Sequence, residues 1–119
     1  MQHQPTELTL KKSARLLRVA FDDGQTFDLP LEYLRVYSPS AEVRGHGPGQ
    51  EVLQVGKKHV VVTRIEPVGS YAVRLVFDDG HNSGLFSWDV LYDLGINHEQ
   101  NWQHYLLRLD EAGATREPR

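Results

Sequence analysis

Six histidines are the first candidates for chemistry in this chain, because imidazole binds metals and transfers protons near neutral pH. Zinc hydrolase helices carry histidines four residues apart, whereas His98 and His104 lie six positions apart and would project from different faces of a helix. His46 and His81 each stand beside glycine in a predicted loop. Two interpretations of this pair stay open: local hydrogen bonding, or a small-molecule or metal site at which both side chains converge.

Acidic pairs and a glycine-rich segment supply the remaining candidates. Asp22–Asp23 and Asp78–Asp79 are most simply structural, because neighbouring strand residues point to opposite faces and Asp before Gly is ordinary turn chemistry. The segment Arg44–Gly49 offers backbone N–H groups to an anion but lacks the Gly-Lys-Ser/Thr ending of a phosphate loop. The sequence contains no cysteine, which excludes disulfides, cysteine-based zinc sites and thiol nucleophiles. With no nucleophile–base–orienter set, we expect a protein that is not an enzyme and holds no cofactor.

Length and composition are those of one small domain: 119 residues, 39% hydrophobic and 24% charged. The net charge is −3 and the basic residues are scattered, which argues against a nucleic-acid partner. The apolar runs are far too short for a membrane span, and the start of the chain lacks the pattern of a signal peptide, so we expect no membrane contact and a cytoplasmic location. We predict a single domain over residues 7–113, between disordered segments at 1–6 and 114–119.

Two segments are alike and indicate an internal repeat. Leu17–Gly24 and Val73–Gly80 match at a constant offset of 56 residues, and each alternates apolar with other residues before ending at Asp-Asp-Gly. This pattern predicts a β-strand closed by a hairpin turn. The other predicted elements of the two units are second strands at 27–29 and 84–86, short helices at 30–36 and 88–94, and further strands at 7–11 and 59–65.

The clearest predicted helix lies between Asn97, which can cap it, and Gly113. Its apolar side chains follow helical spacing and form one stripe, made of Trp102, Tyr105, Leu106 and Leu109. We expect this stripe to pack on the sheet. The predicted fold class is therefore α+β: a small antiparallel β-sheet built from two β-hairpin/short-helix units, with a C-terminal helix packed on it.

Four phrases of the sequence, taken together, carry a resemblance to a known family: Leu34–Val43, Gly45–Gly47, Pro67–Ala72 and Phe77–Gly84. They resemble the family of the gamma-butyrobetaine hydroxylase N-terminal domain, over about Glu7 to Leu94. The family includes stand-alone bacterial proteins of unknown function, which this chain most resembles. It also includes domains attached to 2-oxoglutarate oxygenases and to P-loop ATPases that carry iron–sulfur clusters. No segment of this chain matches the oxygenase domain.

The resemblance implies a zinc site that this chain has lost. In the oxygenase branch, three cysteines and one histidine hold a structural zinc. Alignment on Leu34-Arg35 places the three cysteines at Ser38, Ser40 and Val43, and the histidine at His81. Serine and valine cannot replace thiolates, so we expect a fold without zinc, in which His81 serves as a hydrogen-bond partner for the loop, for instance to a serine hydroxyl.

An accessory role is the function that the resemblance implies. We expect a non-enzymatic binding domain that docks on another protein, with self-association also open and with iron–sulfur or 2-oxoglutarate oxygenase pathways as candidate contexts. Residues 38–49 form a long Gly/Pro-containing loop, and loops of such length in small domains commonly carry function. Candidate binding residues are Ser38, Ser40, Glu42, Arg44, His46 and His81. The alternative is a small-molecule or metal-binding domain that uses His46 and His81.

Overall fold

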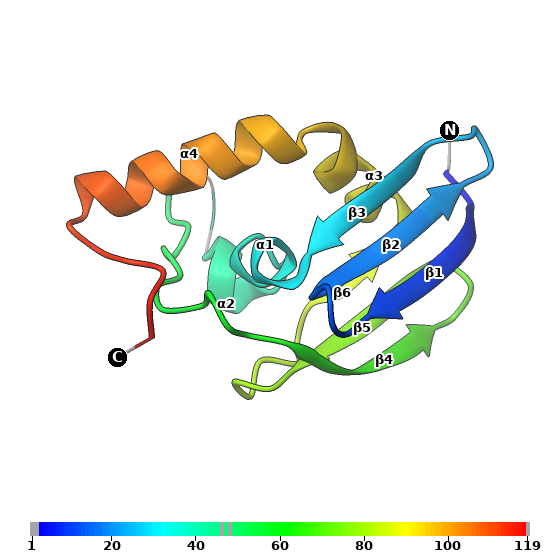
Figure 1. The fold of residues 1–119 in the computed structure, drawn as a ribbon, viewed down its shortest axis with the longest axis horizontal. Coiled ribbons are helices and arrows are strands. Elements are labelled where there is room, and N and C mark those ends of the chain that lie inside the picture. Colours follow the sequence, from blue (N-terminus) through cyan, green and yellow to red (C-terminus); the bar gives the residue numbers. More distant parts are fainter. Residues whose placement is uncertain (1–2, 46, 48, 119) are drawn as a thin grey trace.

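The computed structural model describes residues 3–45, 47 and 49–118, and it has the predicted α+β class. The first unit contains β1 (Pro5–Lys11), β2 (Leu16–Phe21), β3 (Thr26–Pro30) and α1 (Leu31–Val36). A second unit repeats this order with β4 (Val62–Val68), β5 (Ala72–Phe77), β6 (Leu85–Ser87) and α3 (Trp88–Ile96). Between the units lies the short helix α2 (Ala41–Arg44), and α4 (His98–Glu111) follows the second unit (Figure 1).

The repeat extends further than the sequence indicates, because each unit is a three-stranded antiparallel meander followed by a helix. The strand orders are β1-β2-β3 and β4-β5-β6, so the strands form two small sheets where the sequence analysis expects one. Equivalent strands keep equivalent pairing, with Leu17 opposite Leu29 and Val73 opposite Phe86. Both Asp-Asp-Gly turns place their glycine at φ +89°, a conformation that only glycine adopts without strain. Local turn chemistry thus builds both hairpins.

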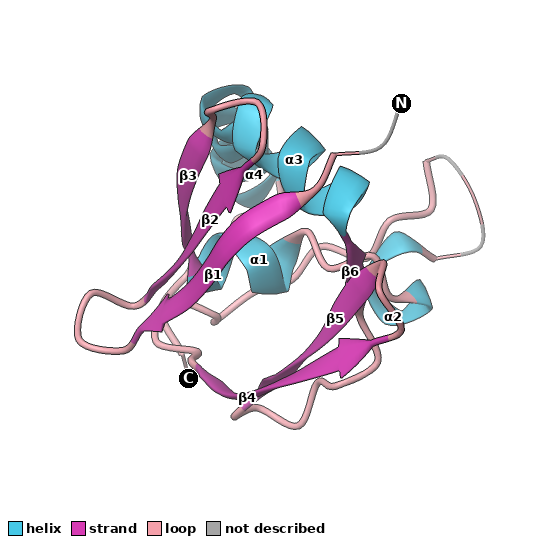
Figure 2. Cartoon of the chain, turned by 90° about the vertical axis from the view of Figure 1, so that its right-hand side faces the viewer, coloured by secondary structure: helices cyan, strands magenta, loops and turns pink. Residues whose placement is uncertain are grey.

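One hydrophobic core joins the two units. Alternate residues of the central strands face inward and are buried, namely Leu17, Val19 and Phe21 in β2, and Val73, Leu75 and Phe77 in β5. The sheets open as a V, and α1 lies between them (Figure 2). Every residue of α1 is buried, including Glu32 and Arg35, because the helix is covered on all sides. This buried helix holds the segment that follows it, which begins at Tyr37, in a fixed position against the core.

The apolar stripe of α4 is buried as predicted but covers a different surface. Tyr105 and Leu109 form a second cluster with Val36 of α1. Leu53 packs against this cluster from residues 49–61, which precede β4 and are called the inter-unit segment. The stripe therefore packs chiefly on α1 and this segment, and not on a sheet. Asn97 occupies the N-cap position, but its side chain donates hydrogen bonds to Asp93 and makes no cap bond.

Two boundaries differ from the sequence-based expectations. Strand β4 begins at Val62 and continues through Pro67, which an edge strand tolerates because one side of its backbone has no ladder partner. Described residues near both ends make backbone contacts, and the predicted domain bounds of 7–113 stay a prediction. Residue Pro5 already belongs to β1, and the backbone N–H groups of Gly56 and Lys58 donate to the carbonyls of Thr115 and Arg116, each at 3.0 Å. No helix among the described residues is both long and apolar enough to cross a lipid bilayer.

Candidate binding site

Two connecting segments meet at the predicted site. The first runs from the end of α1 through Ser38 and Ser40 into α2, and the Ser40 hydroxyl caps that helix by accepting the Glu42 N–H at 3.2 Å. The second is the β5–β6 connection, which begins with the turn at Gly80 and carries His81 and Ser83. The packing of α1 beside β5 therefore brings together side chains about 40 positions apart in sequence, as the 43-residue separation of Ser38 and His81 illustrates.

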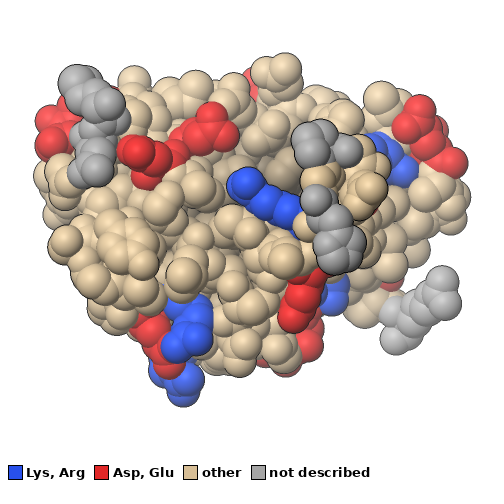
Figure 3. Space-filling model, turned by 180° about the vertical axis from the view of Figure 1, so that it is seen from behind, with Lys and Arg blue, Asp and Glu red and all other residues tan. Residues whose placement is uncertain are grey.

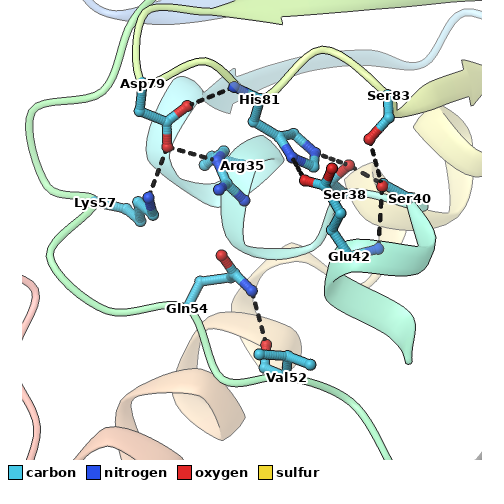
Figure 4. Close-up of polar contacts among 10 residues, drawn as sticks. All are labelled: Arg35, Ser38, Ser40, Glu42, Val52, Gln54, Lys57, Asp79, His81 and Ser83. Atoms are coloured by element: carbon cyan, nitrogen blue, oxygen red, sulfur yellow. Dashed lines mark hydrogen bonds and ion pairs between the residues drawn. The ribbon is translucent and has the colours of Figure 1, made fainter. Parts of the chain in front are cut away.

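The His81 ring links these segments through both of its nitrogens (Figure 4). Its Nε2 lies 2.9 Å from the Ser38 hydroxyl, and its Nδ1 lies 2.8 Å from a Glu42 carboxylate oxygen. The Ser40 and Ser83 hydroxyls form a second link at 2.7 Å. The predicted hydrogen bond between His81 and a serine is thereby confirmed, and four of the candidate residues (Ser38, Ser40, Glu42 and His81) lie together.

The order serine–histidine–carboxylate has the connectivity of a nucleophilic triad, but the serine is in the wrong environment for catalysis. Ser38 has 0% of its surface exposed, and its Oγ also lies 3.3 Å from the Ser40 N–H. A Cβ added to Gly84 would lie 2.3 Å from the same oxygen, so the backbone of the β5–β6 connection covers it closely. A substrate carbonyl has no approach to this hydroxyl. The chemistry that the arrangement supports is structural hydrogen bonding.

Zinc does not fit the positions that correspond to the family's ligands. Val43 is buried and offers no donor atom, and the direct contact of Ser38 with His81 Nε2 occupies the nitrogen that a metal would need. His81 also has its other ring nitrogen bonded to Glu42. In the part of the chain that the structure describes, no three His, Asp or Glu side chains cluster as a metal site would require.

A second polar group, which the sequence analysis missed, fixes the same turn from the other side. Asp79 accepts hydrogen bonds from Arg35 of α1 at 2.9 Å, from Lys57 at 2.6 Å and from the backbone N–H of His81 at 3.2 Å. Burial acts to raise the pKa of the Asp79 carboxyl, but these hydrogen bonds outweigh it and lower that pKa to about 2. In the sequence, an aspartate before glycine is already accounted for by the turn. No pattern therefore indicated that Asp79 also pairs with Arg35 and Lys57.

Ser38, Ser40, Glu42 and His81 are called the closed cluster below. Beside this cluster lies an open groove of about 610 Å³. Its floor includes buried apolar side chains from three helices, Val36 of α1, Val43 of α2 and Leu94 of α3. Arg44, at the end of α2, and Arg108, in α4, contribute basic side chains to the lining. Seen from behind, this face of the molecule is hollowed next to a basic side chain (Figure 3). The groove has the mixed apolar and charged lining that is typical of recognition sites.

The charged residues of the groove differ in how they are satisfied. Glu51 accepts the Gly49 N–H at 3.1 Å, and Asp93 accepts the Asn97 side-chain amide at 3.0 Å. Arg44 and Arg108 form no ion pair with any of the described residues. The two guanidinium groups are therefore the charged groups of the lining that remain unpaired within the described residues.

The predicted site residues thus divide between two places. Ser38, Ser40, Glu42 and His81 form the closed cluster, with Ser38 also at the wall of the groove, and Arg44 and Val43 line the groove itself. His46 lies outside the described residues, so its convergence with His81 stays a prediction. Sequence reasoning missed Arg108, because one arginine in the last turn of a helix has an ordinary explanation in the helix dipole.

Comparison with known proteins places these features in a family context. Residues 8–92 match the family model described as gamma-butyrobetaine hydroxylase-like, N-terminal. No curated protein matches the chain.

Solved structures extend the similarity to the whole chain. One NMR solution structure is 46% identical with a TM-score of 0.86 and covers 100% of this chain and 94% of its own. Another is 56% identical with a TM-score of 0.83, over 98% of this chain and 86% of its own. A crystal structure from Acidithiobacillus ferrooxidans, of a protein of unknown function in the DUF971 family, is 40% identical with a TM-score of 0.65, over 77% of this chain and 92% of its own.

Proposed function

Because this chain belongs to the gamma-butyrobetaine hydroxylase-like N-terminal family, we propose that it is a non-enzymatic accessory domain that docks on another protein through the groove between α2 and α4. The observation that carries the proposal is the pair of groove arginines, Arg44 and Arg108, which have no ion-pair partner in the described chain. Iron–sulfur or 2-oxoglutarate oxygenase pathways are the context we propose for the partner.

The character of the groove favours a protein segment over a compact metabolite. Its walls come from four helices, α1, α2, α3 and α4, and its apolar floor would be covered by side chains of the partner. Arginine is enriched at protein interfaces because its guanidinium makes directional bonds and loses little hydration on burial. A partner segment with apolar residues and carboxylates matches this lining.

The closed cluster supports the non-enzymatic part of the proposal. Ser38 and His81 are buried, and each has its polar atoms bonded within the chain. Their hydrogen bonds hold the α1–α2 connection against the β5–β6 connection and so fix the wall of the groove. In this proposal His81 positions the docking surface and does not itself contact the partner.

Affinity capture from the native cell extract tests the proposal. The bait is the wild-type chain, the Arg44→Gln/Arg108→Gln variant, or Arg64→Gln as the matched control, since Arg64 is 67% exposed on β4 and outside the groove. We expect one protein to be captured by wild type and by Arg64→Gln, and to be lost with the double variant while its circular dichroism stays unchanged. Equal capture by all three baits would show that docking does not use the groove.

A further inference from the structure

The end of the chain forms a structure that the docking groove does not explain. After α4, Gly113 takes a positive φ of +62° and reverses the chain, and residues 114–118 return beside the segment that precedes β4 (Figure 1). We call residues 114–118 the C-terminal strap. Its backbone accepts hydrogen bonds from the N–H groups of Gly56 and Lys58, each at 3.0 Å, and Lys58 pairs with Glu117 at 2.6 Å.

The strap brings one side chain, Arg116, against α1 and α4. Its Nε and Nη2 donate to the two carboxylate oxygens of Glu32 at 2.8 and 2.7 Å, and its guanidinium carbon lies 5.2 Å from the centre of the Trp102 ring. A two-pronged bond to a carboxylate together with an aromatic face is the combination by which proteins distinguish arginine from lysine. We call Glu32 and Trp102 the arginine pocket.

Arg116 supplies the positive charge that pairs with the Glu32 carboxylate. The Glu32 side chain is 8% exposed on the buried helix α1, and among the described residues Arg116 is the one side chain that bonds its carboxylate. A buried carboxylate is costly to leave without a partner, so an empty pocket would strongly favour any guanidinium that reaches it. Glu32 lies on α1 and Trp102 lies on α4, so both side chains of the pocket come from outside the strap.

The contacts that hold the rest of the strap are weaker. Glu117 is 55% exposed and Lys58 is 39% exposed, and ion pairs between exposed side chains contribute little. The pairing of Arg116 with Glu32 is therefore the principal polar side-chain contact that holds the strap.

We propose that the arginine pocket is a binding site for an extended, arginine-bearing peptide of a partner protein, and that the C-terminal strap occupies it as a competing ligand of the same chain. The strap defines the ligand: an arginine for Glu32 and Trp102, backbone carbonyls for Gly56 and Lys58, and an acidic residue after the arginine for Lys58. This site is distinct from the groove, whose lining includes neither Glu32 nor Trp102.

Peptide titration of the full chain, followed by the NMR signal of the Trp102 indole N–H, tests the proposal. The probe is acetyl-Ala-Thr-Arg-Glu-Pro-amide, and the matched control peptide carries neutral citrulline in place of arginine. The Arg116→Ala chain, whose pocket is vacated, should bind the arginine peptide about tenfold more tightly than wild type, because the competing side chain is gone. Citrulline should weaken binding to that variant by about tenfold or more, since the charged pair is lost.

Two further variants keep the test decisive. If Arg116→Ala does not fold, Arg116→Lys retains one charge and should still be displaced by the arginine peptide. Glu32→Gln added to either variant should remove the preference for arginine over citrulline. Equal binding of the two peptides, or no shift of Trp102 in a folded variant, would overturn the proposal. A wild-type dimer in sedimentation that Arg116→Ala abolishes would also overturn it, because the occupant would then be a second copy of the strap.

Discussion

His81 is the residue on which the candidate site is organised, because its ring contacts both connecting segments. Both ring nitrogens are bonded, one to a fully buried serine and one to a carboxylate at the molecular surface. A metal ligand needs a free nitrogen, and a general base needs a reachable substrate. The ring instead joins the same two loops that the bond between Ser40 and Ser83 also connects.

The Ser38 hydroxyl should therefore matter for stability. Ser38→Ala leaves His81 Nε2 buried without its partner, so we expect the free energy of unfolding to decrease by about 1–3 kcal/mol. Chemical denaturation of the purified variant measures this. A loss near zero would mean that the bond contributes nothing to holding the loop.

Gly84 tests the same contact from the other side. A Cβ there would lie 2.3 Å from Ser38 Oγ, so we expect Gly84→Ala to cost about 1–3 kcal/mol by overpacking. In the Ser38→Ala background the obstructing oxygen is absent, and the cost should fall by about 1 kcal/mol in a double-mutant cycle. Strictly additive losses would contradict the packing that the structure describes.

At the scale of elements, Asp79 joins three parts of the fold: α1 through Arg35, the inter-unit segment through Lys57, and its own hairpin turn. The side chain is 22% exposed, and its lowered pKa reports how strongly the folded state favours the ionised carboxylate. The loss of this charge should loosen all three connections together.

This arrangement predicts a pH dependence. The folded pKa of Asp79, about 2, lies below the ordinary value of 3.8, so ionisation stabilises the fold above about pH 4, and this contribution is lost as the pH falls towards 2. From the size of that difference we expect a contribution of about 2 kcal/mol. When the pH is lowered from 5 to 2.5, the free energy of unfolding should decrease more for wild type than for Asp79→Asn. Parallel curves for the two proteins would contradict the assignment.

The contact between α3 and the first sheet gives an independent test of how the units pack. A Cβ at Gly95 would lie 2.4 Å from the Phe27 ring, which belongs to β3. Alanine favours an isolated helix by up to about 1 kcal/mol, yet we expect Gly95→Ala to lower the melting temperature because overpacking costs about 1–3 kcal/mol. Phe27→Leu should restore part of the loss. A Gly95→Ala chain as stable as wild type would refute the close approach.

Elements that depend on local chemistry could be predicted from the sequence, and elements that depend on distant surfaces could not. The two Asp-Asp-Gly hairpins and the stripe of α4 follow from turn conformation and helical periodicity. Whether the strands share one sheet depends on which edges meet, and a stripe on a helix does not say what covers it. Hence the two sheets, and the packing of Tyr105 against α1, became evident only in the structure.

The site divides in the same way. A bond from His81 to a serine of the loop could be predicted from the aligned motifs, whereas the choice of Ser38 came from the structure. Arg35 and Lys57 could not be paired with Asp79 from sequence, because the turn alone accounts for an aspartate before glycine. The C-terminal strap has a polar composition that predicts disorder, while Glu32, the partner of Arg116, lies 84 residues earlier in the chain.

At the scale of the whole molecule, two similar units share one core and present two separate recognition features. The groove lies between α2 and α4, and the arginine pocket lies between α1 and α4. Both depend on α4, which belongs to neither repeat and lies beyond the family match at residue 92.

Site-specific photocrosslinking in the native cell tests whether docking uses the groove. Glu51 lines the groove and is exposed, so p-benzoylphenylalanine placed there should form a covalent adduct with the partner, and Arg44→Gln/Arg108→Gln should abolish that adduct. The same residue placed at Tyr71, which is 57% exposed and outside the groove, should give none. An adduct from position 71 and not from position 51, or one at 51 that ignores the two arginines, would contradict the account.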